Sequence, residues 1–199
     1  MALYLTGDAA ADGLLEQDAF ALVVGMILDQ QIPLERAFAA PFALRERLGE
    51  LDARAIAAMD PERLAAAFRE KPALHRFPAA MAERVQLAAR AVVERYGGDA
   101  AAIWTGAGSG AELLRRVSAL PGFGEQKARI FCALLGKRLG VRPPGWEEAS
   151  APFGAPGSFA SVADIDGPEA LRRVREYKQQ MKAAARSLAR VDAARPASR

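Results

Sequence analysis

Hydrophobic residues recur along almost the whole chain at the three- and four-residue spacing of α-helices, and the alternation typical of β-strands is nearly absent. The most apolar segment, Gly13–Leu28, is hydrophobic almost all round, which predicts a helix buried at the centre of a bundle. About 45 alanines, the residue with the highest helix propensity, agree with this interpretation. The pattern therefore predicts an all-α fold.

Proline, glycine and capping residues delimit the other expected elements. The loop from Lys71 to Pro78 is bounded by two prolines, and Gly140–Gly157 is rich in proline and glycine, which predicts irregular structure. Residues 190–199 are expected to form a flexible tail. The remaining helices are predicted at Leu34–Leu48, Ala53–Ala58, Pro61–Phe68, Pro78–Tyr96, Ala111–Ala119, Glu125–Leu139 and Pro168–Ala189.

One segment between two predicted helices has a distinctive composition, Leu120-Pro121-Gly122-Phe123-Gly124-Glu125-Gln126-Lys127-Ala128. The proline and the two glycines predict a tight hairpin. Because Gly124 has no side chain, an anion can approach the N–H groups that open the second helix, where the helix dipole adds about half a positive charge. Lys127 and Arg129 add to this charge, and a nucleic-acid phosphate is the natural anion. An ordinary glycine turn is the alternative interpretation.

The charge distribution supports such a partner better than the net charge of +3 does. The first 60 residues carry ten acidic and four basic side chains, whereas the rest of the chain carries 23 basic and 14 acidic ones. A basic C-terminal two thirds fits a nucleic-acid partner. The final predicted helix contributes several arginines and lysines, for which a solvated face is the alternative to a surface that follows phosphates.

A polar triplet, Asp29-Gln30-Gln31, ends the buried helix. Burying these side chains without partners would cost several kcal/mol, so we expect them to face a cleft. Together with the hairpin about ninety residues later, the Gln-Gln helix end resembles the helix-hairpin-helix (HhH-GPD) DNA glycosylase superfamily of base-excision repair enzymes. The resemblance covers about residues 14–145.

This resemblance implies one unit of two helical lobes over residues 1–199, with an inner lobe at about 30–110, a helix-hairpin-helix at 111–139 and the active site between the lobes. It also implies that a damaged nucleotide is flipped out of double-stranded DNA, and that Gln30 or Gln31 fills the vacated space. The residues expected to contact DNA are Gln30, Gln31, Gly122, Phe123, Gly124, Gln126, Lys127 and Arg129.

A flipped base needs aromatic walls. Trp146 is favoured because it lies in the loop Pro143-Pro144-Gly145-Trp146, where a large aromatic residue is less easily explained by packing. Phe77 and the only histidine, His75, are further candidates for the base pocket. His75 could donate a proton to the leaving base, although an ordinary surface histidine is the commoner case.

The chain departs from the family in its catalytic groups. Family members carry an aspartate about five helical turns beyond the hairpin, and in this chain Pro143-Pro144 occupies that position. Asp29 is therefore our first candidate, followed by Glu147 and Glu148; a carboxylate bonded to a neighbouring loop is the alternative for Asp29. Gln126 occupies the position at which strand-cleaving members carry a Schiff-base lysine, so we expect base removal by water.

One cysteine, Cys132, excludes an iron–sulfur cluster and indicates a cluster-free branch like that of 3-methyladenine glycosylase. We expect no cofactor and no metal site, and a monomer. The longest apolar run, Ala19–Leu28, is too short to span a membrane, so a cytoplasmic, nucleoid-associated protein is expected.

The expected activity is release of a damaged or modified base, with a modified uracil such as 5-hydroxymethyluracil or an alkylated purine as candidates. The alternatives are a catalytically inactive module that recognises distorted or abasic DNA, and a helical protein-interaction domain.

Overall fold

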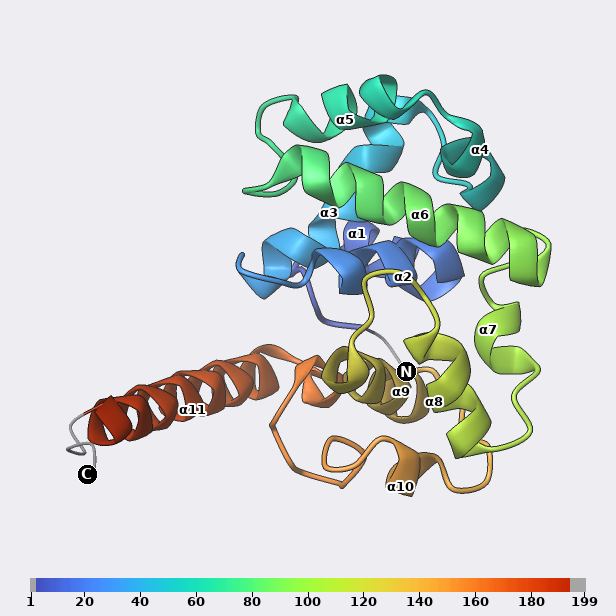
Figure 1. The fold of residues 1–199 in the computed structure, drawn as a ribbon. Helices are drawn as coiled ribbons and strands as arrows, with labels where there is room; N and C mark the ends of the chain where they lie inside the picture. Colours follow the sequence, from blue (N-terminus) through green and yellow to red (C-terminus); the bar gives the residue numbers. More distant parts are fainter. Residues whose placement is uncertain (1–2, 194–199) are drawn as a thin grey trace, which may run out of the picture.

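The computed structural model describes residues 3–193, which form helices and connecting loops with no strand among them (Figure 1). The predicted all-α fold is confirmed. No helix within this range is both long and apolar enough to cross a membrane. The elements are α1 (Ala9–Gln17), α2 (Ala19–Leu28), α3 (Leu34–Leu48), α4 (Ala53–Ala58), α5 (Pro61–Arg69), α6 (Pro78–Tyr96), α7 (Ala102–Thr105), α8 (Gly110–Ser118), α9 (Glu125–Arg138), α10 (Trp146–Ala149), η1 (Val162–Asp164) and α11 (Pro168–Ala193).

The predicted continuous helix Gly13–Leu28 is wrong, because Asp18 divides it into α1 and α2. The Asp18 backbone is extended, and its carboxylate accepts hydrogen bonds from the N–H groups of Phe20 at 2.8 Å and Ala21 at 3.0 Å. An aspartate competes with the helical backbone in this way and is a preferred N-cap. The break leaves α2 as a short helix buried almost all round.

The helices form two groups (Figure 1). Helices α1–α6 pack on one another, and α8, α9, α10 and η1 pack together beneath them, with α7 against α8. Helix α2 lies at the boundary, because it packs on α3 and α6 and also meets the loop between α8 and α9. The lobe limits implied by the resemblance, residues 30–110, stay a prediction.

The α8–α9 loop is the predicted hairpin, and its glycine conformation brings it against α2. Gly122 has a φ of +90°, which favours glycine. A Cβ built on Gly122 would lie 3.5 Å from Ile27 Cγ1, so the loop rests directly on α2. The Phe123 side chain is buried and its ring centroid lies 5.5 Å from that of Phe131 in α9. This packing fixes the start of α9 beside the end of α2.

Helix α11 projects from the body (Figure 1). Val174 is buried, whereas the described side chains that follow it are exposed. Arg175 forms an ion pair with Glu35 in the first turn of α3. The helix continues four residues beyond its predicted end at Ala189. The predicted tail is helical to Ala193, and its remainder lies outside the described residues.

Candidate nucleic-acid interface

The C-terminal end of α2 and the N-terminal end of α9 enclose a cavity of about 420 Å³. Asp29, the C-cap of α2, lies at this cavity together with the hairpin, although nearly a hundred residues separate the two in sequence. The end of α2 and the hairpin therefore lie side by side in the structure. The cavity is lined by Met26, Asp29, Gly124, Glu125, Gln126, Lys127 and Ile130.

The hairpin presents an open helix N-terminus. Gly124 is the N-cap of α9 and offers no side chain to its N–H groups. No atom lies within 4 Å of a Cβ built on Gly124, so the space in front of these donors is free among the described residues. Such an end binds anions through its N–H groups and dipole. Phe123 differs from expectation, because its side chain is buried and only its backbone reaches this surface.

Lys127 points into the protein. Its Nζ donates hydrogen bonds to the carbonyl oxygens of Met26 at 2.7 Å and Ile27 at 3.1 Å, at the end of α2. Burial lowers the pKa of Lys127 from its usual 10.5 to about 8, although the nearby Asp29 carboxylate opposes this effect. The amine thus already binds two carbonyl oxygens that lack partners within α2, and its expected contact with a DNA phosphate stays a prediction.

Arg129 is also held within the protein. Its guanidinium pairs with Glu125 at 2.8 Å, one turn earlier on α9, and donates to the carbonyl oxygen of Ala151 at 3.2 Å. These contacts tie the segment after α10 to α9. The hairpin's basic side chains are thus engaged within the protein, whereas the N-cap of α9 carries no side chain.

The two glutamines after Asp29 have different surroundings. The Gln30 side chain donates to the carbonyl oxygen of Ile27 at 2.7 Å and to Met81 Sδ at 3.3 Å, and it accepts a hydrogen bond from Arg84 at 2.9 Å. Gln31 is exposed and has a φ of +56°, which is uncommon for a residue with a Cβ. Of the two, Gln31 is the one with an exposed side chain.

His75 does not line a base pocket, which corrects the prediction. Its ring is only 1% exposed. Nδ1 accepts a hydrogen bond from the Phe77 N–H at 3.1 Å, and Nε2 lies 2.8 Å from the carbonyl oxygen of Gln30. Burial lowers the pKa of His75 below its usual 6.5. Phe77 itself is 44% exposed, with the Arg76 guanidinium 4.8 Å from its ring centroid.

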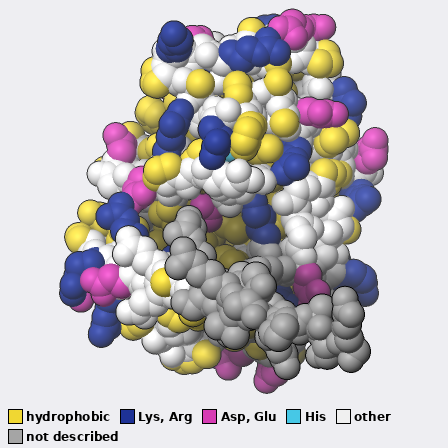
Figure 2. All heavy atoms as spheres, turned by 60° about the vertical axis from the view of Figure 1, so that its left-hand side comes forward, with side chains coloured by type: hydrophobic (Ala, Val, Ile, Leu, Met, Phe, Trp, Pro, Cys, Tyr) yellow, Lys and Arg dark blue, Asp and Glu magenta, His cyan; other side chains and the backbone are white. Residues whose placement is uncertain are grey.

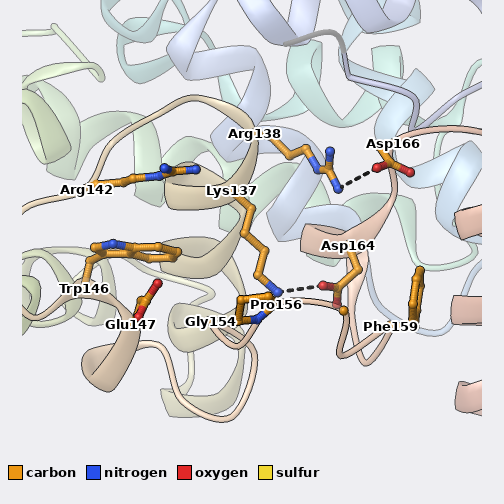
Figure 3. Close-up of a pocket in the computed structure, with 11 residues that line it drawn as sticks. Lys137, Arg138, Arg142, Trp146, Glu147, Gly154, Pro156, Phe159, Asp164 and Asp166 are labelled. Atoms are coloured by element: carbon orange, nitrogen blue, oxygen red, sulfur yellow. Dashed lines mark hydrogen bonds and ion pairs between the residues drawn. The ribbon is translucent and has the colours of Figure 1, made fainter.

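Two other predicted site residues, Trp146 and Glu147, lie at a second cavity, of about 460 Å³ (Figure 3). Trp146 packs on Gly136, where a built Cβ would lie 2.3 Å from the indole ring. Glu147 lines the same cavity, and Glu148 is exposed on α10. Gly136 is nine residues beyond Lys127, or about 13 Å along α9. The structure therefore does not bring Trp146, Glu147 or Glu148 to Asp29.

Sequence reasoning missed Arg84, which holds the Gln30 amide oxygen. A signal was present, because Arg84 lies in α6 three residues after Met81, which the Gln30 side chain also contacts, and positions three apart share one face of a helix. Figure 2 shows one face of the molecule with a hollow at its middle, where hydrophobic side chains are visible and both basic and acidic side chains stand around them.

The fold and the hairpin define an all-α protein with a helix-hairpin-helix. A family model described as HhH-GPD superfamily base excision DNA repair protein matches residues 24–192. The chain therefore belongs to the HhH-GPD superfamily of base excision DNA repair proteins, a family that acts on DNA. Comparison with curated proteins and with solved structures gave no match. The match reaches through most of α11, beyond the segment in which the sequence motifs lie.

Proposed function

We propose that the protein is a DNA glycosylase that hydrolyses the N-glycosidic bond of a damaged or modified base in duplex DNA, acting as a monomer on nucleoid DNA. The observation that carries the proposal is the cavity that Asp29 shares with the open N-terminus of α9. A carboxylate at the end of α2 and an anion site at the start of α9 thus face the same cavity. A nucleotide needs both groups at once, because its phosphate is negative and its sugar becomes cationic as the base leaves.

In this mechanism the N–H groups of α9 hold a backbone phosphate, and Gln31 occupies the space left by the flipped nucleotide. The Asp29 carboxylate stabilises the positive charge that develops on the sugar as the bond from C1′ to the base breaks. The base leaves with the bonding electrons and takes up a proton, while water adds to C1′ and releases a proton. Asp29 thus takes the role of the aspartate that the family carries after the hairpin.

The proposed reaction stops at base removal. The position of the family's Schiff-base lysine is Gln126, which lines the cavity, and the neighbouring Lys127 amine is bonded to the end of α2. For the substrate, Met26 and Ile130 supply apolar contact while Gln126 and Asp29 supply polar groups. This mixture supports a modified uracil such as 5-hydroxymethyluracil, or an alkylated purine as in the cluster-free 3-methyladenine-glycosylase-like branch.

The test is single-turnover base release from a panel of duplexes that each contain one lesion. Asp29→Asn keeps the shape of the side chain and should lower the rate by about 10²- to 10³-fold, the scale for losing one electrostatic group at a reacting centre. Glu147→Gln and Glu148→Gln are matched controls, since both carboxylates lie away from the cavity, and they should keep the rate of the natural protein. An undiminished rate in Asp29→Asn would remove the proposed catalytic group.

The second candidate function is a non-catalytic module that recognises distorted or abasic DNA. It is favoured by one observation, namely that prolines occupy the usual position of the catalytic aspartate. Failure to release any base, together with tight and salt-dependent binding to abasic DNA, would support this module. Failure to bind duplex DNA at low salt would instead support a protein-interaction domain.

A further inference from the structure

His75, the only histidine of the chain, joins the turn after α2 to the loop before α6, and each of these segments carries an exposed side chain, Gln31 and Phe77. The N–H of Phe77 donates to Nδ1, so in the neutral ring the proton resides on Nε2. Nε2 then donates to the carbonyl oxygen of Gln30, 2.8 Å away. Both ring nitrogens are thereby used in one tautomer, and the ring itself is buried.

The two bonds act on the backbone beside exposed side chains. The carbonyl of Gln30 belongs to the peptide group that joins Gln30 to Gln31. The hydrogen bond from His75 therefore holds this peptide group in place, and the φ of Gln31 describes the rotation of Gln31 relative to it. A φ of +56° costs a non-glycine residue about 1 kcal/mol or more and persists only where its surroundings hold it. Phe77, whose N–H is held by the same ring, offers an exposed aromatic face.

The side chain of Gln30 is also held in place, by groups other than His75. Arg84 of α6 binds its amide oxygen, while its amide nitrogen donates to Ile27 at the end of α2. The Gln30 backbone and side chain are thus held by separate groups, and Gln31 is left as the protruding residue of the turn.

We propose that His75 is a positioning residue for base excision: its neutral ring holds Gln31 and Phe77 in a fixed relation to each other, ready to engage DNA. The inference rests on the proposed function, because it assigns Gln31 to the space of the flipped nucleotide. His75 contacts neither the cavity nor Asp29 in this role and acts only through the two residues that it positions.

Protonation of His75 would abolish the arrangement. A second ring proton would sit on Nδ1 and face the N–H of Phe77, so two donors would oppose each other. The charged groups that act on the ring are Arg36 from α3, Arg76 from the preceding loop and Arg84 from α6, and all of them disfavour the protonated form. Burial is the largest effect and lowers the pKa of His75 together with these arginines, although the bond to the Gln30 carbonyl opposes them. The ring is therefore neutral at pH 7, and DNA engagement declines on acidification.

The first experiment is nitrogen-15 NMR of the full chain, in which a lone histidine gives an unambiguous pair of imidazole signals. At pH 7 we expect a protonated Nε2 and an unprotonated Nδ1. A proton on Nδ1, or a charged ring at this pH, would overturn the proposal. This readout is independent of whether the protein releases a base.

The second experiment compares His75→Phe with His75→Gln in binding to a duplex that carries a stable abasic analogue. His75→Phe keeps an aromatic ring but loses both hydrogen bonds, and it should weaken binding about tenfold. His75→Gln keeps an amide that can donate to Gln30 and cannot be protonated, so it should bind within about threefold of the natural protein and lose the decline of binding at acid pH. In a Gln31→Gly background, His75→Phe should weaken DNA binding much less than it does in the natural protein.

These results test the role of His75 and the glycosylase proposal separately. Unchanged binding by a folded His75→Phe, or an unchanged acid decline in His75→Gln, would overturn the role of His75. If the natural protein binds the abasic analogue with the expected dependence on His75 but releases no base from any lesion, the glycosylase proposal fails and the positioning role stands for DNA binding alone.

Discussion

The Nζ of Lys127 lies 2.7 Å from the carbonyl oxygen of Met26, so the lysine of the hairpin closes the C-terminal end of the buried helix α2. A cation there interacts favourably with the dipole of α2 and satisfies a carbonyl that lacks an intrahelical partner. The contact joins the two halves of the candidate site, because Met26 lies one helical turn before Gln30 and Lys127 lies one turn into α9. The relative position of Asp29 and the hairpin depends on it.

Lys127→Met should lower the free energy of unfolding by about 1–2 kcal/mol at pH 7, because the Met26 carbonyl loses its partner. The difference from the natural protein should widen above pH 8. The pKa of Lys127 is about 8 in the folded protein and has its usual value of 10.5 in the unfolded chain, so the unfolded chain binds more protons between these values. The free energy of unfolding of the natural protein therefore rises with pH across this range. The variant has no amine at position 127, so its free energy of unfolding lacks this rise. Urea unfolding at pH 7, 9 and 10 would measure both effects, and equal pH slopes would contradict the assignment.

Gln126→Lys should create an activity that the natural protein lacks. The substitution puts an amine at the family's Schiff-base position, on the wall of the cavity, where it can attack C1′ of an abasic site. Borohydride should therefore trap the variant on abasic DNA as a covalent adduct and leave the natural protein untrapped. Trapping of the natural protein, abolished by Lys127→Met, would show instead that Lys127 is a nucleophile.

The hairpin could be predicted because its signal is local. Gly122 and Gly124 specify the turn and the open helix end through their own backbone geometry. Side-chain directions could not be predicted in the same way. Lys127 finds its partners 100 and 101 residues away, and His75 finds Gln30 45 residues away, so no window of sequence contains both members of either contact.

Trp146 shows a second limit of sequence reasoning. Its loop is rich in proline and glycine, which gave reason to expect an exposed aromatic residue. In the structure Gly145 starts the short helix α10, and the indole packs on α9 at Gly136, the one place where a missing side chain admits it. Glycine within a helix pattern can therefore mark a docking site for an aromatic ring from elsewhere in the chain.

Gly124→Ala should weaken DNA binding without disturbing the fold. Gly124 has a φ of −78°, which any residue adopts, and an added Cβ meets nothing in the described protein. The methyl group would occupy the space through which a phosphate reaches the N–H groups of α9, so we expect lower affinity and a shallower salt dependence. Gly13→Ala is the matched control: it lies in α1, also has free space, and should raise stability by about 0.5–1 kcal/mol with unchanged binding. Equal affinities for both variants would argue against the hairpin as the phosphate site.

Gln31→Gly should separate stability from function. Glycine adopts a φ of +56° without strain, so the variant should be as stable as the natural protein or more stable by about 1 kcal/mol. It lacks the side chain that fills the space of the flipped nucleotide, so base release should fall, and fluorescence of a 2-aminopurine in the lesion strand should report less flipping. Gln31→Asn, which tolerates this φ and keeps an amide, should lie between the two. A normal flipping signal in Gln31→Gly would assign the filling of the gap to another residue.

Asp164→Asn should destabilise the protein while leaving the chemistry of each folded molecule intact. Asp164 is buried against Lys137, whose Nζ lies 2.6 Å from its carboxylate, and it also accepts hydrogen bonds from Ser158 and from the N–H groups of Ala160 and Ser161 (Figure 3). Removing the negative charge leaves the Lys137 ammonium buried without its counter-ion, a change that costs about 3 kcal/mol or more.

Asp166→Asn is the control for this loss, because Asp166 is 61% exposed and lies 3.6 Å from Arg138 in the same cavity. The Asp166 carboxylate is solvated, and the buried Arg138 guanidinium also donates to the carbonyl oxygen of Ala163 at 3.1 Å, so this variant should lose less stability than Asp164→Asn. Both variants should release base at the natural rate once the rate is normalised to folded protein, since the cavity of Figure 3 lies away from Asp29 and its ion pairs hold η1 and the preceding loop on α9. A normalised rate that falls with Asp164→Asn but not with Asp166→Asn would instead show that this cavity contributes to catalysis.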